Sequence, residues 1–163
     1  MVASVDRREQ ILSRILAILG GIDGIVMAVR DWGDIPPKET EDGTTQLPAA
    51  VLLDGEETNT LKTVGHSPGQ RMPATVVGLR PQIWVVPLPS DTIKNVGIPA
   101  FISQTRIKVL KALINDETLL SLMGANGGME YLGMKTDMQS GSTMEGNFML
   151  DCMFNYTFNP AQL

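Results

Sequence analysis

The stretch from Leu47 to Glu57 constrains the fold more than any other part of the sequence. Its middle, Ala49 to Leu53, is apolar at every position, so both faces of an extended segment would have to be covered. We therefore expect a buried strand at the centre of a sheet. Pro48 suits the first position of that strand, and Gly55 is typical of a turn that ends it.

Apolar periodicity places the other elements around this strand. Spacing of three to four residues predicts helices, one of them started by Asp6 with Glu9 three residues later, and a short one capped by Asp116. Alternation of apolar and polar residues predicts strands. The expected helices span 6–19, 98–115 and 116–123, and the expected strands span 25–30, 48–54, 72–88, 129–136 and 145–158.

Strands and helices are grouped along the chain, in the order α-β-β-β-α-α-β-β. Such grouping is typical of an α+β fold rather than a doubly wound parallel sheet. We expect a single domain over residues 1–163, with a mixed or mainly antiparallel sheet and helices packed on one face. Pro81 cannot donate a ladder hydrogen bond, so a bend, a bulge or a sheet edge is expected there.

Two connections are unusually long for a compact domain. Residues 31–46 and 56–71 are polar, contain glycine and proline, and carry few apolar side chains. Loops of this length are usually functional or disordered. We expect both to be loops that become ordered only against a neighbouring subunit.

Composition narrows the class of protein. The chain has 163 residues, 43% of them hydrophobic, so it can form a core. A formal net charge of −5 argues against a general nucleic-acid binder, which needs a basic face. We find no targeting signal and no apolar run of the roughly 18 residues that a membrane helix needs, which favours the host cytoplasm as the place of assembly.

The negative charge is concentrated in one region. Residues 31–60 contain eight acidic residues against one lysine, and three of the acids, Asp54, Glu56 and Glu57, follow the buried strand directly. Such a region either keeps the protein soluble or is complementary to a basic partner. The three carboxylates could also hold a hard cation such as Mg²⁺ or Ca²⁺, although their spacing is not that of a calcium loop.

The search for catalytic motifs gives one literal match and no cofactor site. Residues 65–69 read G-x-S-x-G, with Ser67 at the nucleophile position. A nucleophile elbow needs a strand before it, a helix after it and a histidine later in the chain, whereas the only histidine, His66, precedes the serine. We therefore expect no enzyme activity, no cofactor and no metal. Cys152, the single cysteine, lies on the apolar face of the last strand and is expected to be a core residue.

The order of segments resembles a known family. The helix "REQILSRILAIL" leads into "GGIDGIVMAVRDW", followed by "LPAAVLLDGEE", "RIKVLKALINDETLLSLMGANGGMEYLGMKTD" and the last strand "MEGNFMLDCMFNYTF". Together they resemble the small tail terminator and neck proteins of long-tailed bacteriophages over nearly the whole chain. The segment 56–71 is longer than is usual for that family.

The resemblance implies a structural virion protein of the phage tail and neck. Such proteins form a homohexameric ring that terminates the tail tube and joins the tail to the head-side connector, with DNA passing through the lumen. The implied partners are other copies of the chain, the tail tube protein and a head-tail connector or head-completion protein, with no specific nucleic-acid readout and no membrane.

Two alternatives remain open beside this reading. One is a head-completion or connector protein on the portal side, and the other is a small metal-dependent enzyme that uses the carboxylates after the buried strand. Under the structural reading, charged and aromatic residues would form the subunit interfaces. The candidates are Glu39, Glu41, Asp42, Asp54, Glu56, Glu57, Arg80, Trp84, Lys108 and Lys111.

Overall fold

The computed structural model describes residues 6–34, 47–66, 68–69, 71–88, 97–137 and 146–163. The element order matches the sequence prediction. The elements are α1 (Arg7–Gly20), β1 (Met27–Val29), η1 (Trp32–Asp34), β2 (Ala49–Gly65), β3 (Ala74–Val86), α2 (Ile98–Ile114), α3 (Glu117–Met123), β4 (Gly128–Asp137), β5 (Asn147–Phe158) and η2 (Pro160–Gln162).

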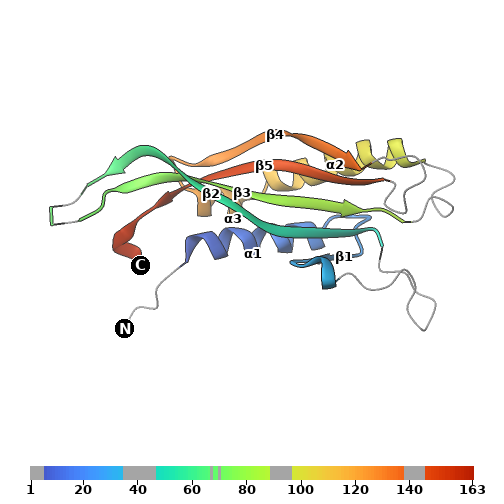
Figure 1. Ribbon diagram of the computed structural model, residues 1–163, viewed down its shortest axis with the longest axis horizontal. Coiled ribbons are helices and arrows are strands. Elements are labelled where there is room, and N and C mark those ends of the chain that lie inside the picture. Colours follow the sequence, from blue (N-terminus) through green and yellow to red (C-terminus); the bar gives the residue numbers. More distant parts are fainter. Residues whose placement is uncertain (1–5, 35–46, 67, 70, 89–96, 138–145) are drawn as a thin grey trace.

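The strands form one five-stranded sheet in the order β1-β2-β3-β5-β4 (Figure 1). β1 pairs with β2 in parallel, and the other three pairs are antiparallel, so the sheet is mixed as expected. Of the apolar stretch that was predicted to be buried, Ala49 to Leu52 are fully buried and Leu53 is partly exposed. The middle strand of the sheet is nevertheless β3. β2 is the second strand, because only the three-residue β1 lies beyond it. The expectation that the apolar stretch after Pro48 forms the central strand is therefore corrected.

All three helices contribute to one core on one face of the sheet. From β2, β3 and β5 this core takes alternate residues, such as Leu52, Ile83 and Phe154, which are fully buried. Against them lie Ile15 of α1 and Val109 of α2, together with α3 residues in the same cluster. The fold is thus an α+β domain with its helices on one face, as the grouped order of elements predicted.

The helix ends follow the local sequence. Asp6 caps α1 by accepting a hydrogen bond from the Glu9 backbone N–H at 3.3 Å. Asp116 caps α3 by accepting one from the Leu119 N–H at 2.7 Å, and Gly124 follows the last residue of that helix. These caps satisfy N–H groups that have no partner inside a helix. Both predicted N-caps are confirmed, whereas the Glu9 side chain, which would complete a capping box with Asp6, accepts hydrogen bonds from Arg30 and Ser13 instead.

The prediction of a loop over residues 56–71 is wrong. β2 continues to Gly65 and β3 begins at Ala74, so most of the segment is the second half of a long strand in a β2–β3 hairpin. The side chains of Glu56 to Gly65 are exposed on both faces, so no apolar alternation marks the strand in the sequence. In the other long connection, Trp32–Asp34 form η1, and residues 35–46, with Glu39, Glu41 and Asp42, lie outside the described residues.

Three register shifts separate β2 from a regular strand. They fall between Leu53 and Glu56, between Asn59 and Lys62, and between Thr63 and Gly65. The first lies opposite Arg80 and Pro81, so the irregularity expected at Pro81 occurs in the neighbouring strand. Gly55 is required there, because a Cβ on it would lie 1.7 Å from the Arg80 carbonyl oxygen. Each bulge leaves residues of β2 without a partner in β3.

Candidate functional site

The three predicted carboxylates lie on both faces of the sheet, and the first bulge of β2 decides which of them share a face. Glu57 pairs with the core residue Leu79 and so lies on the helix side, whereas Glu56 pairs with Arg80 and lies on the opposite side. Asp54 contacts arginines on the helix side. The carboxylates therefore do not converge on one point. Within the described residues, no group of three or more His, Cys, Asp or Glu side chains is placed to hold a metal ion.

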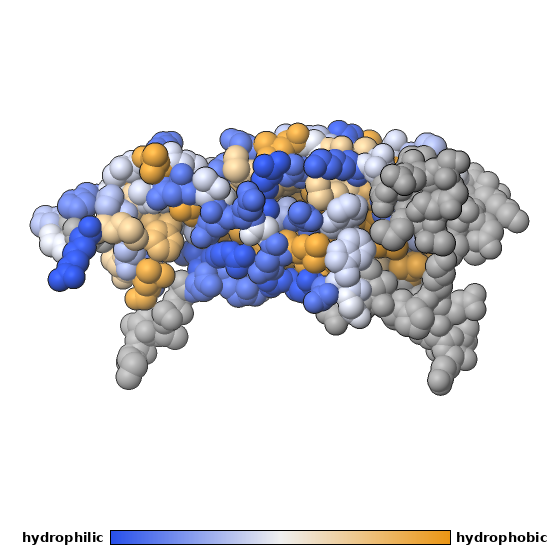
Figure 2. Space-filling view, viewed as in Figure 1, coloured by the Kyte–Doolittle hydropathy of each residue, from blue (hydrophilic) through white to orange (hydrophobic). Residues whose placement is uncertain are grey.

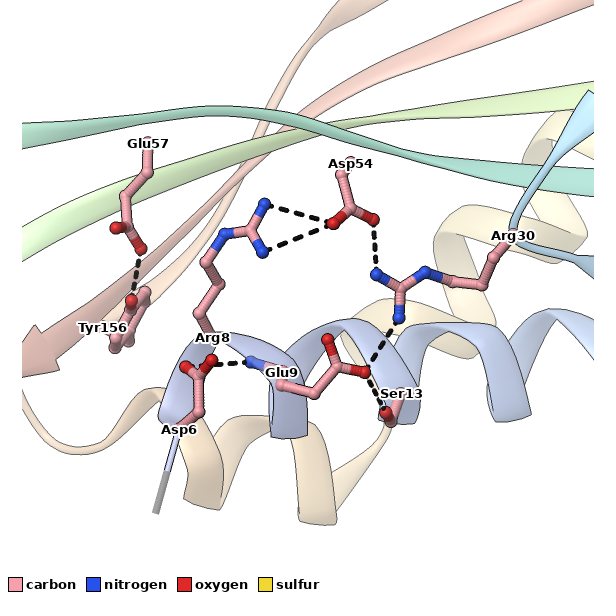
Figure 3. Close-up of polar contacts among 8 residues, drawn as sticks. All are labelled: Asp6, Arg8, Glu9, Ser13, Arg30, Asp54, Glu57 and Tyr156. Carbon is pink, nitrogen blue, oxygen red and sulfur yellow. Dashed lines mark hydrogen bonds and ion pairs between the residues drawn. The ribbon is translucent and has the colours of Figure 1, made fainter. Parts of the chain in front are cut away.

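Asp54 lies at the centre of an ionic network between α1, β1 and β2 (Figure 3). Both terminal nitrogens of Arg8 donate to its Oδ2 at 3.3 Å, and Arg30 donates to its Oδ1. Arg30 also donates to Glu9 Oε1 at 2.9 Å, and Ser13 donates to the same oxygen at 3.0 Å. Two arginines and two carboxylates thus join the first turns of α1 to the end of β1 and to the bulge. We call these four charged residues and Ser13 the Asp54 network.

The Asp54 network keeps its carboxylates ionised. Partial burial acts to raise the pKa of Asp54, but the hydrogen bond and charge of Arg30 and the charge of Arg8 outweigh it and lower that pKa. Hydrogen bonds from Arg30 and Ser13 lower the pKa of Glu9. Both carboxylates are about half exposed, so each pair alone contributes little to stability. The network matters chiefly because it fixes the position of the β2 bulge relative to α1.

A second contact holds the segment just beyond the bulge. The hydroxyl of Tyr156, a ring that is only 2% exposed, donates a hydrogen bond to Glu57 (Figure 3). Burial of the ring, followed by the hydrogen bond to the carboxylate, raises the pKa of Tyr156. The buried tyrosine of β5 therefore fixes the Glu57 side chain at the point where β2 leaves the covered part of the sheet.

The face of the sheet opposite the helices carries a different set of polar contacts. Arg80 donates from Nε and Nη2 to the two carboxylate oxygens of Asp151, at 2.8 and 2.5 Å, and this hydrogen bonding lowers the pKa of Asp151. The pair borders a hollow of 370 Å³ beside the bulge. Farther along, the Trp84 indole donates to Gln82 at 3.1 Å and packs edge-on against Trp32, with 5.5 Å between the ring centroids.

A mainly apolar groove lies between the helices. It has a volume of 510 Å³ and is lined by small and aliphatic side chains: Ala17, Ile18, Ile22 and Ala112. Ion pairs border it. Arg14 forms a two-fold hydrogen-bonded pair with Asp116 at 3.0 and 2.5 Å, and Lys108 lies 3.8 Å from the Asp23 carboxylate. In the next subsections this hollow is called the helix groove.

The structure separates the residues that the sequence suggested for an interface. Arg80 and Trp84 lie on the face opposite the helices, Lys108 borders the helix groove, and Lys111 is exposed in the last turn of α2. Asp54 and Arg80 are engaged inside the subunit, with Arg8, Arg30 and Asp151 as partners. Sequence reasoning missed these partners, since residues 24 to 71 positions apart form the pairs.

The structure also tests the sequence predictions for the G-x-S-x-G motif and for Cys152. The motif begins at Gly65, the last residue of β2, where a polar loop was expected, and β3 follows it as predicted. Ser67 itself lies outside the described residues. Cys152 is fully buried in β5, and burial raises the pKa of its thiol to about 12. The prediction of a core cysteine is confirmed.

Two comparisons of the sequence with known proteins give no match. No protein-family model matches the sequence, and no curated protein gives a significant match. In the described part of the chain, none of the helices is both long enough and apolar enough to cross a membrane.

Proposed function

We propose that this chain is a structural virion protein that assembles into a homohexameric ring at the end of a phage tail tube. The ring would join the tail to the head-side connector and let DNA pass through its lumen. The order of segments that resembles tail terminator proteins is the basis for naming this class of assembly.

The observation that carries the proposal is the outer half of β2, which we define as Glu56–Gly65. This segment is extended, its side chains are exposed, and in the described part of the chain only β3 pairs with it. A strand held firmly but covered by little of its own domain is suited to contact with another subunit.

The charge distribution also supports a ring around DNA. The net charge of −5 gives no general attraction to phosphates, and a lumen with acidic walls would repel the DNA backbone and let it slide. Polar and apolar side chains are interspersed on the surface, with hydrophilic ones concentrated over α1 and the middle of β2 (Figure 2).

Electron microscopy of the purified protein tests the proposal directly. We expect rings of six subunits at high protein concentration. Monomers at every concentration and salt condition would contradict the proposed function.

A binding assay distinguishes a tail terminator from the main alternative, a head-completion or connector protein. Pull-down with tail tube protein as one bait and portal-side connector protein as the other should recover the chain with the tube protein. Recovery with the portal-side protein alone would instead support a head-completion protein.

A further inference from the structure

The backbone at Leu61 is unusual for a leucine. Its φ is 62°, in the left-handed region that bulky residues rarely adopt, and it lies inside the second bulge of β2. The Asn59 side chain accepts a hydrogen bond from the Leu61 N–H at 2.7 Å, and the Thr60 hydroxyl donates to the Val76 carbonyl at 2.7 Å. Two side-chain hydrogen bonds therefore hold a strained conformation in place.

The result of this conformation is an apolar side chain that points into solvent. Leu61 is 83% exposed, the highest value among the large exposed apolar residues of the described chain. Val64 and Met72, nearer the hairpin end, are 37% and 46% exposed. Apolar side chains lie among hydrophilic ones at this end of the molecule (left in Figure 2). Strain and exposure at one residue are unfavourable for the free subunit, which points to a use in a complex.

The bulges also determine which kind of contact β2 can make. Addition of a further strand to the open edge of β2 needs an unbroken row of backbone N–H and C=O groups. Three register shifts interrupt that row, and bulges are a common protection of edges against strand addition. Contact through the protruding leucine side chain is therefore favoured over a continued sheet.

The helix groove provides a matching socket on the same chain. Its apolar lining and its volume of 510 Å³ leave room for a leucine side chain. At its border the Asp23 side chain is fully exposed, while Lys108 donates to the Asp23 backbone carbonyl at 3.3 Å. Lys62, exposed and next to Leu61, carries the charge opposite to that of Asp23. The leucine and its lysine neighbour thus complement the groove and its carboxylate.

We propose that Leu61 of one copy inserts into the helix groove of the next copy, with Lys62 beside Asp23. The leucine and the groove belong to different elements of the chain, so the contact is head-to-tail. Repetition of such a contact closes into a ring or continues as a filament. This inference rests on the proposed assembly function and names the surface that would make it.

Leu61→Gly tests the leucine without damage to the fold. Glycine adopts a φ of 62° without strain, so the melting temperature should stay at or near the wild-type value. The assembled fraction, measured by analytical ultracentrifugation below saturation, should fall about tenfold or more, as expected when a buried leucine contact is lost. Leu120→Ala, which removes another exposed leucine (47% exposed), is the control and should assemble normally. If Leu61→Gly unfolds, Leu61→Asn replaces it, since asparagine tolerates this conformation.

Ala17→Trp tests the groove in the same way. Ala17 is exposed, so the indole should fill the groove without disturbing the core. Assembly should fall about tenfold or more, whereas Ser103→Trp, on an exposed position of α2 outside the groove, should have no effect. A charge exchange adds a pairwise test: Lys62→Glu and Asp23→Lys should each weaken assembly, and the double variant should recover it.

A mixture of Leu61→Gly and Ala17→Trp tests the head-to-tail geometry. One variant keeps an intact groove and the other an intact leucine, so the mixture should give dimers and no rings. Normal rings from either variant alone would overturn the inference and leave the proposed function standing. An effect of Leu61→Gly without an effect of Ala17→Trp would overturn the assignment of the groove. Absence of any assembly by the wild-type chain would reject both the inference and the proposed function.

Discussion

The two halves of β2 have opposite environments although they belong to one continuous strand. The inner half, Ala49–Leu53, pairs with β3 throughout, and its first three residues also pair with β1; Ala49 to Leu52 are fully buried. The outer half, Glu56–Gly65, pairs only with β3 in the described chain and is exposed. The bulge at Asp54 and Gly55 separates them. The inner half therefore contributes to folding stability, and the outer half is left free for contact with other molecules.

The largest expected effect is a core truncation in the inner half. Leu52→Ala should lower the free energy of unfolding by about 2–5 kcal/mol, because it leaves a cavity in a fully buried site. Leu61→Ala in the outer half should change it by less than about 0.5 kcal/mol. Denaturant titration of both variants measures the difference. Equal losses in the two halves would show that the division of β2 is wrong.

A smaller effect is expected where the halves meet. Gly55→Ala would place a Cβ 1.7 Å from the Arg80 carbonyl oxygen, so the backbone must move, at a cost of about 1–3 kcal/mol. Gly65→Ala is the matched control at the end of the outer half. No heavy atom lies within 4 Å of its added Cβ, and we expect no loss of stability there. Thermal unfolding compares the two, and a loss at Gly65 equal to that at Gly55 would argue against close packing at the bulge.

The smallest expected effect is the loss of folding stability at acidic pH. Asp54 and Glu9 have lowered pKa values in the folded protein, so their contribution is fully present above the ordinary carboxyl pKa and is lost as the pH falls through the folded value. The free energy of unfolding should therefore fall as the pH drops below the ordinary carboxyl range, near pH 4. Asp54→Asn should cost about 0.5–1 kcal/mol at pH 7 and reduce this slope. An unchanged slope in urea titrations across the range would mean that the Asp54 network does not stabilise the fold.

The inner half of β2 could be predicted as a strand from the sequence because it is buried. Its residues are apolar on both faces, just as the helices show their buried stripes and caps in their own sequences. Gly55 at the boundary and Asn59 in the outer half are residue types that usually mark turns, and here they lie at bulges inside a strand instead. Its exposed side chains carry no periodic signal, so sequence reasoning took it for a loop.

The contacts of the candidate site were harder to predict. Arg8 and Arg30 reach Asp54 from 46 and 24 positions away, and Asp151 reaches Arg80 from 71. Such pairs depend on how the elements pack, which no local spacing encodes. The acidic character of the region was visible in the sequence, but the one-residue bulge decides that Glu57, rather than Glu56, lies on the helix side with Asp54.

The buried thiol of Cys152 can be used to measure how often the core of the protein opens. It is the only cysteine in the chain, it is fully buried in β5, and burial raises its pKa to about 12. A thiol reagent can therefore react only with molecules in which β5 has separated from the helices. When opening and closing are fast relative to labelling, the ratio of the labelling rate to that of an exposed thiol gives the population of the open state. One unmodified residue thus allows the opening of the core to be followed in free subunits and in assemblies, without an added label.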